Sequence, residues 1–180
     1  MCKIKSHIMD SNTMCRTIMR MSHEITEKNK GTDDVVLVGI KRRGEIIADM
    51  ICSNIEKIEG VKVDCGNIDI KFYRDDLSPA FDMPEVRKAE LSFSIVDKKV
   101  IIVDDVLYTG RTVRAAIDAI FSLGRPKSIQ LAILVDRGHR ELPIRADYVG
   151  KSIPTSVSER VCVKIPPIDD ETGVYLYENM

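Results

Sequence analysis

Two adjacent carboxylates, Asp104 and Asp105, stand between an apolar run and a turn that carries hydroxyl groups. Residues 100–103 before them are all apolar, and Thr109, Gly110, Arg111 and Thr112 follow them. Backbone N–H groups at the start of a helix, together with two hydroxyls, can cradle a phosphate. Carboxylates instead accept hydrogen bonds from vicinal sugar hydroxyls. A ligand with both a phosphate and a diol fits this turn, whereas an isolated Asp-Asp pair would merely cap a helix.

A second turn offers the opposite charge. Lys41, Arg42 and Arg43 lie between Gly39 and Gly44, after another apolar run and before another helical pattern. Glycines allow the backbone to bend tightly. Arginine makes forked contacts with phosphate oxygens, so cations and N–H groups together could hold a diphosphate. Alone, such a turn would be a solvated basic patch; beside the first turn, it indicates a diphosphate loop.

Short apolar or alternating runs predict the strands that must position these turns. They are residues 35–38, 61–63, 68–73, 100–103, 129–135, 161–165 and 174–177. Wholly apolar runs are typical of strands that are covered on both faces. Ligands bind beyond the carboxyl ends of such strands, which is where both turns lie.

Helical periodicity fills the intervals between the predicted strands. Met14, Ile18, Met21 and Ile25 recur at spacings of four, three and four residues, in a helix that begins at Asp10 or Ser11 and stops at Gly31. Two further helical patterns are carried by Ile46, Ile47, Met50, Ile51 and Ile55, and by Val113, Ala116, Ile117, Ile120 and Phe121, the last ending at Gly124 and Pro126. Strands that alternate with helices predict a parallel, right-handed α/β sheet in a single domain, residues 1–180.

The segment from residue 75 to 94 has a different character. It is polar, contains Pro79 and Pro84 and shows no clear period. It is therefore predicted to be a long loop or mobile hairpin, and loops of this length in compact domains are usually functional.

Composition excludes several classes of protein. With 44% hydrophobic and 31% charged residues and a net charge of -1, the chain has no global attraction for nucleic acid or membrane, so any polyanion site must come from local clustering of cations. The five cysteines form no CxxC pair, and Cys52 and Cys162 sit among apolar residues, as inert core thiols in a reducing cytoplasm would. No signal-peptide core and no apolar run of membrane-spanning length occurs, so a cytoplasmic location is expected.

Residues 100–112, VIIVDDVLYTGRT, resemble the motif that binds phosphoribosyl diphosphate (PRPP) in type I phosphoribosyltransferases. The resemblance implies that family's α/β fold: a central, mainly parallel sheet flanked by helices. It assigns PRPP or nucleotide binding to Lys41, Arg42, Arg43, Asp104, Asp105, Val106, Leu107, Tyr108, Thr109, Gly110, Arg111 and Thr112, with Asp104, Asp105 and Arg43 catalytic. Mg²⁺ would enter with PRPP rather than occupy a dedicated protein site, and Asp104 or Asp105 is where the protein would contact it.

The same family has a flexible hood that closes over PRPP and excludes water. Residues 70–78, IKFYRDDLS, resemble its base, so a hood is expected at roughly residues 68–98; a solvated hairpin is the alternative. The resemblance also implies a non-proline cis peptide in the diphosphate loop.

Residues 136–151, DRGHRELPIRADYVGK, resemble one branch of the family, the regulators of pyrimidine operons that also act as uracil phosphoribosyltransferases. That resemblance implies uracil contacts by Arg137 and the backbone around it, with Val161 nearby. It also implies binding to hairpins of leader messenger RNA by Arg20, His23, Arg140, Arg145 and Lys151. Arg16 and Arg20 share a helix face. A solvated basic face, balanced by nearby acids, is the alternative.

Two functions are therefore expected together. One is the conversion of uracil and PRPP to UMP and diphosphate, with Asp105 as the candidate general base by location. The other is transcription attenuation by an RNA-binding homo-oligomer, a dimer or larger, whose pocket senses UMP or UTP. A purine phosphoribosyltransferase would share the PRPP motif, but the 136–151 stretch argues against it.

Overall fold

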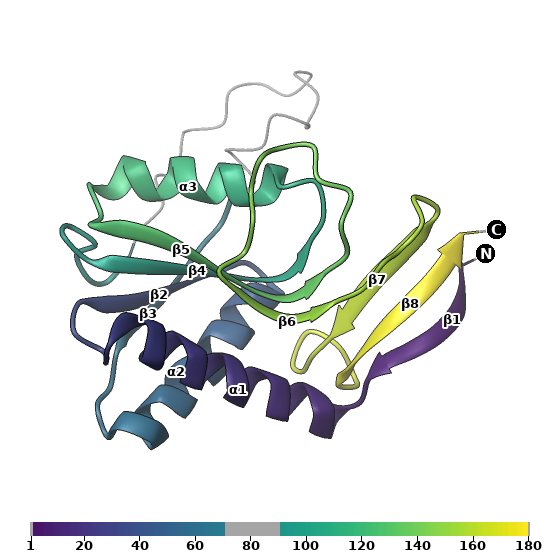
Figure 1. Ribbon diagram of the computed structural model, residues 1–180, viewed down its shortest axis with the longest axis horizontal. Coiled ribbons are helices and arrows are strands. Elements are labelled where there is room, and N and C mark those ends of the chain that lie inside the picture. The colour runs from purple at the N-terminus through teal and green to yellow at the C-terminus, as the bar shows by residue number, and fades with distance from the viewer. Residues whose placement is uncertain (1, 71–90, 180) are drawn as a thin grey trace.

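The computed structural model describes residues 2–70 and 91–179, which form two sheets and three helices (Figure 1). The main sheet is parallel, in the order β3-β2-β4-β5-β6, and the small sheet is antiparallel, in the order β1-β8-β7. Bounds in the main sheet are β2 Val35–Ile40, β3 Asp64–Ile68, β4 Lys99–Leu107, β5 Ser128–Asp136 and β6 Tyr148–Ser152. Those in the small sheet are β1 Cys2–Met9, β7 Glu159–Lys164 and β8 Gly173–Asn179. The helices are α1 Ser11–Asn29, α2 Arg43–Glu59 and α3 Arg111–Leu123.

Helices cover both faces of the main sheet. α1 and α2 lie on one face and α3 on the other (Figure 1). Alternate residues of β4 point to opposite faces, so Ile101 and Val103 pack in the core cluster with α1 and α2, while Val100 and Ile102 pack in the cluster with α3. The predicted α/β architecture, with apolar strands buried on both faces, is confirmed.

The periodic helices form as predicted. In α1, Asp10 is the N-cap and accepts a hydrogen bond from the Thr13 amide at 2.7 Å. The helix ends at Lys30, which adopts a left-handed conformation just before Gly31. In α3 the predicted inward residues Val113, Ala116 and Ile120 are buried, whereas Ile117 is half-buried and Phe121 is 57% exposed. None of the helices in residues 2–70 and 91–179 is long and apolar enough to cross a bilayer.

Strand β3 lies between the two strands that were predicted in its region. Residues 61–63 are not in a strand, and Val61 is exposed. Among the described residues, β3 pairs only with β2, from Val36 opposite Asp64 to Ile40 opposite Ile68. An edge strand with half-exposed side chains does not need an apolar sequence. β3 therefore lacks the apolar or alternating run by which the other strands were predicted. Of the predicted 68–73 strand and 68–98 hood, residues 71–90 lie outside the described part of the chain.

Strand β4 is longer than predicted, so Asp104 and Asp105 lie within it rather than after it. It is central, and its pairing with β5 continues to Leu107 opposite Asp136. The two acids therefore have extended backbone beside β5, just beyond the last pairing of β4 with β2, which is Val103 opposite Gly39. Cys52 and Cys162, predicted as core thiols, are half-buried.

The small sheet brings the two ends of the chain together. β8 pairs with both β1 and β7, and the sheet lies at the end of the main sheet where β2, β4 and β5 terminate (Figure 1). β1 was missed in the sequence because it pairs with a strand at the opposite end of the chain. Its position places the small sheet beside the carboxyl ends of the main strands.

Candidate active site

The two predicted ligand turns open onto one cavity. A space of about 550 Å³ is lined by Lys41, Arg42 and Arg43 on one side and by Asp104 and Asp105 on the other. Strands β2 and β4 are adjacent and parallel, with Gly39 opposite Val103, so their ends meet at the same edge. The structure therefore places the three cations and two acids at one site.

Two glycines allow the basic turn to lie directly on β4. A Cβ atom on Gly44 would be 2.5 Å from the Val103 carbonyl oxygen and 3.3 Å from Oδ1 of Asp104. A Cβ atom on Gly39 would be 2.4 Å from the Glu45 Cα atom. The distances of 2.5 and 2.4 Å are far below van der Waals contact, so a larger residue at either position would force the turn to shift.

The Lys41–Arg42 peptide is cis, as the family resemblance implied. The Lys41 amide donates to the Ile68 carbonyl oxygen at 3.0 Å, which ties the turn to the end of β3. The side chains of Lys41 and Arg42 are exposed. They are therefore accessible to an anionic ligand.

Arg43 is held by an acid that sequence reasoning missed. Its Nε donates to Oδ2 of Asp169 at 3.0 Å and its Nη2 to Oδ1 at 2.8 Å. The hydrogen bond to Asp169 raises the pKa of Arg43, and the charge of Asp105 adds to it. The same hydrogen bond lowers the pKa of Asp169. Asp169 lies in the loop between β7 and β8, where no local pattern marks it as part of a site.

Of the two acids, Asp104 is buried and costly to ionise. Asp104 is 7% exposed, and its Oδ1 accepts the Asp105 amide at 2.9 Å; Oδ1 of Asp105 in turn accepts the Val106 amide at 2.8 Å. Burial, followed by the neighbouring charge of Asp105, raises the pKa of Asp104 well above its usual range. A ligand that brings hydroxyl donors or a cation to these oxygens would relieve that cost.

The donor set suits a metal that arrives with a ligand. Across residues 2–70 and 91–179, no three His, Cys, Asp or Glu side chains gather as a metal site. Asp104 and Asp105 nevertheless supply carboxylate oxygens, which Mg²⁺ prefers, and Mg²⁺ usually takes its remaining ligands from phosphates and water. These residues fit Mg²⁺ bound to a diphosphate.

The hydroxyl-rich turn forms a second hollow that joins the first. A space of about 400 Å³ is lined by residues 106–113 and Glu141, and it shares Val106 and Thr112 with the larger cavity. Helix α3 begins at Arg111, and its N-cap residue, Gly110, has no side chain that could accept a hydrogen bond from the first turn. The Arg111 amide donates a long hydrogen bond to Oγ1 of Thr109, at 3.4 Å. The N-terminus of α3 thus lines a hollow of suitable size for a phosphate.

The 136–151 stretch packs against this turn. The Arg137 amide donates to the Leu107 carbonyl oxygen at 3.1 Å, and the Glu141 and Leu142 amides donate to the Thr109 carbonyl oxygen at 3.0 and 3.1 Å. Nε of Arg111 also pairs with the Glu141 carboxylate at 2.8 Å. Glu141, which sequence reasoning did not assign to the site, therefore supports the turn at residues 106–112, called the phosphate turn below.

Arg137 is buried with one donor unused. The residue is 7% exposed; its guanidinium lies 4.1 Å from the centre of the Tyr108 ring and donates to the Ser156 carbonyl oxygen at 3.1 Å. Its Nε has no hydrogen-bond partner in the described part of the chain. A buried donor without an acceptor costs about 1–3 kcal/mol, so this group is poised for an acceptor on a ligand. Val161, the other predicted base contact, is buried in β7, a strand that contacts β4.

The predicted RNA residues divide into two environments. Arg20 of α1 donates to the Val149 and Gly150 carbonyl oxygens at 3.1 and 2.7 Å and pairs with Glu24, so α1 and β6 lie together. Lys151 is exposed at β6, and His23 is exposed on α1. These residues share one side of the molecule.

Arg140, in contrast, is engaged by its own chain. Its guanidinium donates to the carbonyl oxygens of Tyr108, Gly138 and Ile144 and pairs with the Asp136 carboxylate. The first of these bonds, at 2.6 Å, holds the phosphate turn. The structure therefore places Arg140 as a brace between the site and the following loop.

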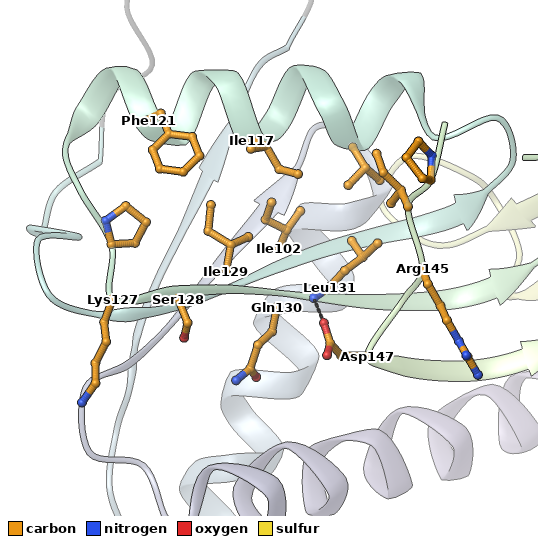
Figure 2. Close-up of a pocket in the computed structure, with 14 residues that line it drawn as sticks. Ile102, Ile117, Phe121, Lys127, Ser128, Ile129, Gln130, Leu131, Arg145 and Asp147 are labelled. Atoms are coloured by element: carbon orange, nitrogen blue, oxygen red, sulfur yellow. Dashed lines mark hydrogen bonds between the residues drawn. The ribbon is translucent and has the colours of Figure 1, made fainter. Parts of the chain in front are cut away.

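A separate groove lies between α3 and β5 (Figure 2). It encloses about 450 Å³ and is lined mainly by apolar side chains, including Ile117, Phe121 and Ile129. Arg145 lies at its margin and extends away from it, on the side of the sheet where α1 lies (Figure 2). The groove has neither an acid pair nor a helix N-terminus, so the chemistry belongs to the first cavity.

Comparisons with known proteins agree with this geometry. The family model of the phosphoribosyl transferase domain matches residues 6–165. The chain is 61% identical to the bifunctional protein PyrR of Clostridium acetobutylicum, over 97% of this chain and 98% of that protein. It is 59% identical to the protein of the same name from Clostridioides difficile, over 97% and 98%.

Solved structures support the fold alone. A hypoxanthine phosphoribosyltransferase from Trypanosoma cruzi superposes with a TM-score of 0.75 at 21% identity, covering 96% of this chain and 95% of that one. Another, from Staphylococcus aureus, gives a TM-score of 0.62 at 23% identity, covering 84% and 78%. The matched domain and the near full-length relatives show that this chain belongs to the phosphoribosyltransferase family and, within it, to the PyrR proteins.

Proposed function

We propose that the protein transfers a phosphoribosyl group from PRPP to uracil, forming UMP and diphosphate, and that nucleotide in the same pocket controls its binding to leader hairpins of pyrimidine messenger RNA. The observation that carries the proposal is the convergence of the basic turn, the acid pair and the α3 N-terminus on joined cavities. PRPP has a diphosphate, a diol and a phosphate in the same order.

Each part of PRPP has a proposed partner. Lys41, Arg42 and Arg43 bind the diphosphate, and Asp104 and Asp105 accept hydrogen bonds from the ribose hydroxyls. The ribose phosphate sits at the turn formed by residues 106–112, where backbone N–H groups and the Thr109 and Thr112 hydroxyls are available. When bound, Mg²⁺ neutralises diphosphate charge beside the two carboxylates.

The reaction needs positioning more than covalent participation by the protein. The bond from ribose C1 to the diphosphate oxygen breaks, the bond from C1 to uracil N1 forms, and the N1 proton is released to Asp105. As diphosphate leaves, C1 becomes cation-like and the leaving oxygens gain charge. The cations of the basic turn stabilise that charge, and fixed placement of both substrates supplies the rest.

Arg137 is proposed to select the base. Uracil presents two carbonyl acceptors and one N–H beside the reacting nitrogen. The unused Nε–H of Arg137 matches one carbonyl oxygen, and backbone groups near Val161 read the remainder of the edge. This assignment is supported by the burial of Arg137 next to the phosphate turn.

The RNA is proposed to bind the side of the molecule formed by α1 and β6, through Arg20, His23, Arg145 and Lys151. Arg140 contributes by tying the adjoining loop to the phosphate turn, so nucleotide occupancy can alter the RNA surface. A homo-oligomer, a dimer or larger, would align two such basic surfaces. A cytoplasmic location is part of the same proposal.

An assay of base preference with PRPP and Mg²⁺ tests the enzymatic proposal. Diphosphate release should occur with uracil and stay at background with hypoxanthine and guanine. Turnover of a purine without turnover of uracil would contradict it and would favour the purine alternative.

A further inference from the structure

The contact between Arg43 and Asp169 joins the β7–β8 loop of the small sheet to the basic turn, residues 41–43. The two residues are 126 positions apart in sequence, yet both oxygens of Asp169 accept hydrogen bonds from one guanidinium. The side chains are 31% and 18% exposed, so water competes only weakly for the contact. Bidentate arginine–carboxylate pairs have a narrow geometry, so this one fixes the plane of the Arg43 guanidinium.

Asp169 is itself held in place. Its Oδ2 also accepts the Ile165 amide at 2.9 Å, and the amides of Ile168 and Asp169 donate back to the Ile165 carbonyl oxygen. The turn that follows β7 therefore orients the carboxylate before Arg43 reaches it. The anchor for Arg43 is rigid.

The contact leaves part of the guanidinium unused. Asp169 takes the edge formed by Nε and Nη2, and Nη1 has no hydrogen-bond partner within residues 2–70 and 91–179. Arg43 also lines the cavity with Lys41, Asp104 and Asp105. An arginine has five N–H donors, so the donors of Nη1 remain for a ligand in that cavity.

We propose that Asp169 is a positioning residue for the diphosphate, which holds Arg43 so that its Nη1 edge faces the leaving group. The inference rests on the proposed phosphoribosyl transfer and names a residue that acts through another. A free arginine side chain loses rotamer freedom when a ligand captures it. With Asp169 present, that loss is incurred on folding, before the diphosphate binds.

Asp169 also has an opposing effect, because its negative charge repels the diphosphate. Lys41 and Arg42 are exposed at the same turn and retain their charge. They can attract the diphosphate over a longer range, while Arg43 donates hydrogen bonds to it in a fixed orientation. The sign of the change in diphosphate affinity therefore decides between positioning and repulsion.

Titration calorimetry with inorganic diphosphate and Mg²⁺ provides the test. Asp169→Asn keeps an oxygen for the Ile165 amide but turns an N–H₂ group toward Nη2 of Arg43, which removes the bidentate contact. Its diphosphate Kd should rise roughly fivefold. Asp169→Glu should recover part of the affinity. Asp170→Asn is the matched control: it makes the same charge change one residue away at an exposed position, and its Kd should stay within about twofold of the parent.

A double-mutant cycle shows whether Asp169 acts through Arg43. In an Arg43→Ala background, Asp169→Asn should cause no further loss of diphosphate affinity. In steady-state assays Asp169→Asn should raise the KM for PRPP and leave the KM for uracil unchanged. General destabilisation would raise neither selectively, and thermal unfolding identifies variants that fail to fold.

Three results would overturn the inference: tighter diphosphate binding by Asp169→Asn, equal effects of Asp169→Asn and Asp170→Asn, or additive losses in the cycle. Diphosphate binding does not depend on the acceptor base. A failure of the uracil assignment would therefore leave this test intact, and the two failures can be told apart.

Discussion

Asp104 combines burial with a neighbouring negative charge, and both oppose its ionisation. Its backbone pairs with β5 near the carboxyl end of β4, and its side chain lies at a buried position there. The folded protein therefore carries a carboxylate that a ligand would satisfy better than the protein does. Arg137 likewise has a buried donor, Nε–H, that lacks an acceptor among the described residues. Binding residues that are poorly satisfied alone are typical of sites built for a ligand.

Replacing Asp104 by Asn should abolish activity and stabilise the free protein. The raised pKa of Asp104 means that the folded state holds its proton more tightly than the unfolded chain, whose carboxyl has its ordinary pKa near ~3.9. The residue therefore costs stability as pH rises through the folded pKa, and the cost is absent below the unfolded value. Asp104→Asn should melt at a higher temperature than the parent at mildly alkaline pH, with a gain that shrinks toward about pH 4.

The same variant should lose phosphoribosyl transfer by about 100-fold or more, because the amide presents donors where ribose hydroxyls need acceptors. RNA affinity should be largely retained, since the acid lies inside the nucleotide pocket. Asp118→Asn, on the exposed side of α3, is the control for both measurements. A lower melting temperature for Asp104→Asn across the whole pH range would contradict the electrostatic reading.

At the scale of elements, the site is assembled by contacts between segments that are distant in sequence. The 136–151 stretch braces the phosphate turn through main-chain bonds to Leu107 and Thr109. α1 meets β6 through Arg20. One continuous stretch thus leaves the nucleotide pocket at Arg137 and reaches the α1 side of the sheet at Lys151, which gives nucleotide and RNA a shared structural element.

Arg145 offers a selective test of the RNA surface. It is exposed and makes no hydrogen bond or ion pair with the described residues, so Arg145→Ala removes a charge and little else. Affinity for a leader hairpin should fall, and the slope of log K against log salt should decrease by about one unit. Arg125→Ala, in the exposed connection after α3, removes an equal charge elsewhere and should have no effect. Identical filter-binding curves for both variants would show that Arg145 does not contact the RNA and is an ordinary solvated residue.

For the whole molecule, two ligands at two places imply a reciprocal linkage. If UMP tightens RNA binding by some factor, RNA must tighten UMP binding by the same factor. The Arg140 bonds to Tyr108 and to the loop before β6 are a physical route for that coupling. Coupling of this type is commonly about 5–150-fold.

Titrations in both directions should give matching factors: RNA with and without UMP, and UMP with and without RNA. AMP, which shares the ribose phosphate but not the pyrimidine, should give a factor near unity. If a saturating hairpin leaves UMP affinity unchanged, nucleotide does not control RNA binding in this protein.

Local patterns suffice for much of the fold. The three helices and the central apolar strands follow from periodicity and capping, since a buried face must recur at 3.6 or two residues whatever surrounds it. The charges of the two ligand turns are also visible, because Asp104, Asp105 and the Lys41–Arg43 cations directly follow apolar runs in the sequence. Strands β1, β3 and β6 were not predicted at their observed bounds. Among the described residues, β3 and β6 are the edges of the main sheet and carry exposed polar residues, and β1 pairs with the far end of the chain.

The partners of the site residues depend on the folded chain. Contacts between residues far apart in sequence decide three features of the site. Arg43 is bound to Asp169, Arg140 donates to the Tyr108 carbonyl oxygen, and Arg137 keeps an unused donor. Sequence patterns report how a segment meets water or the core, because that repeats along the segment. Hydrogen bonds between single side chains have no period, so they are found only once the elements are packed together.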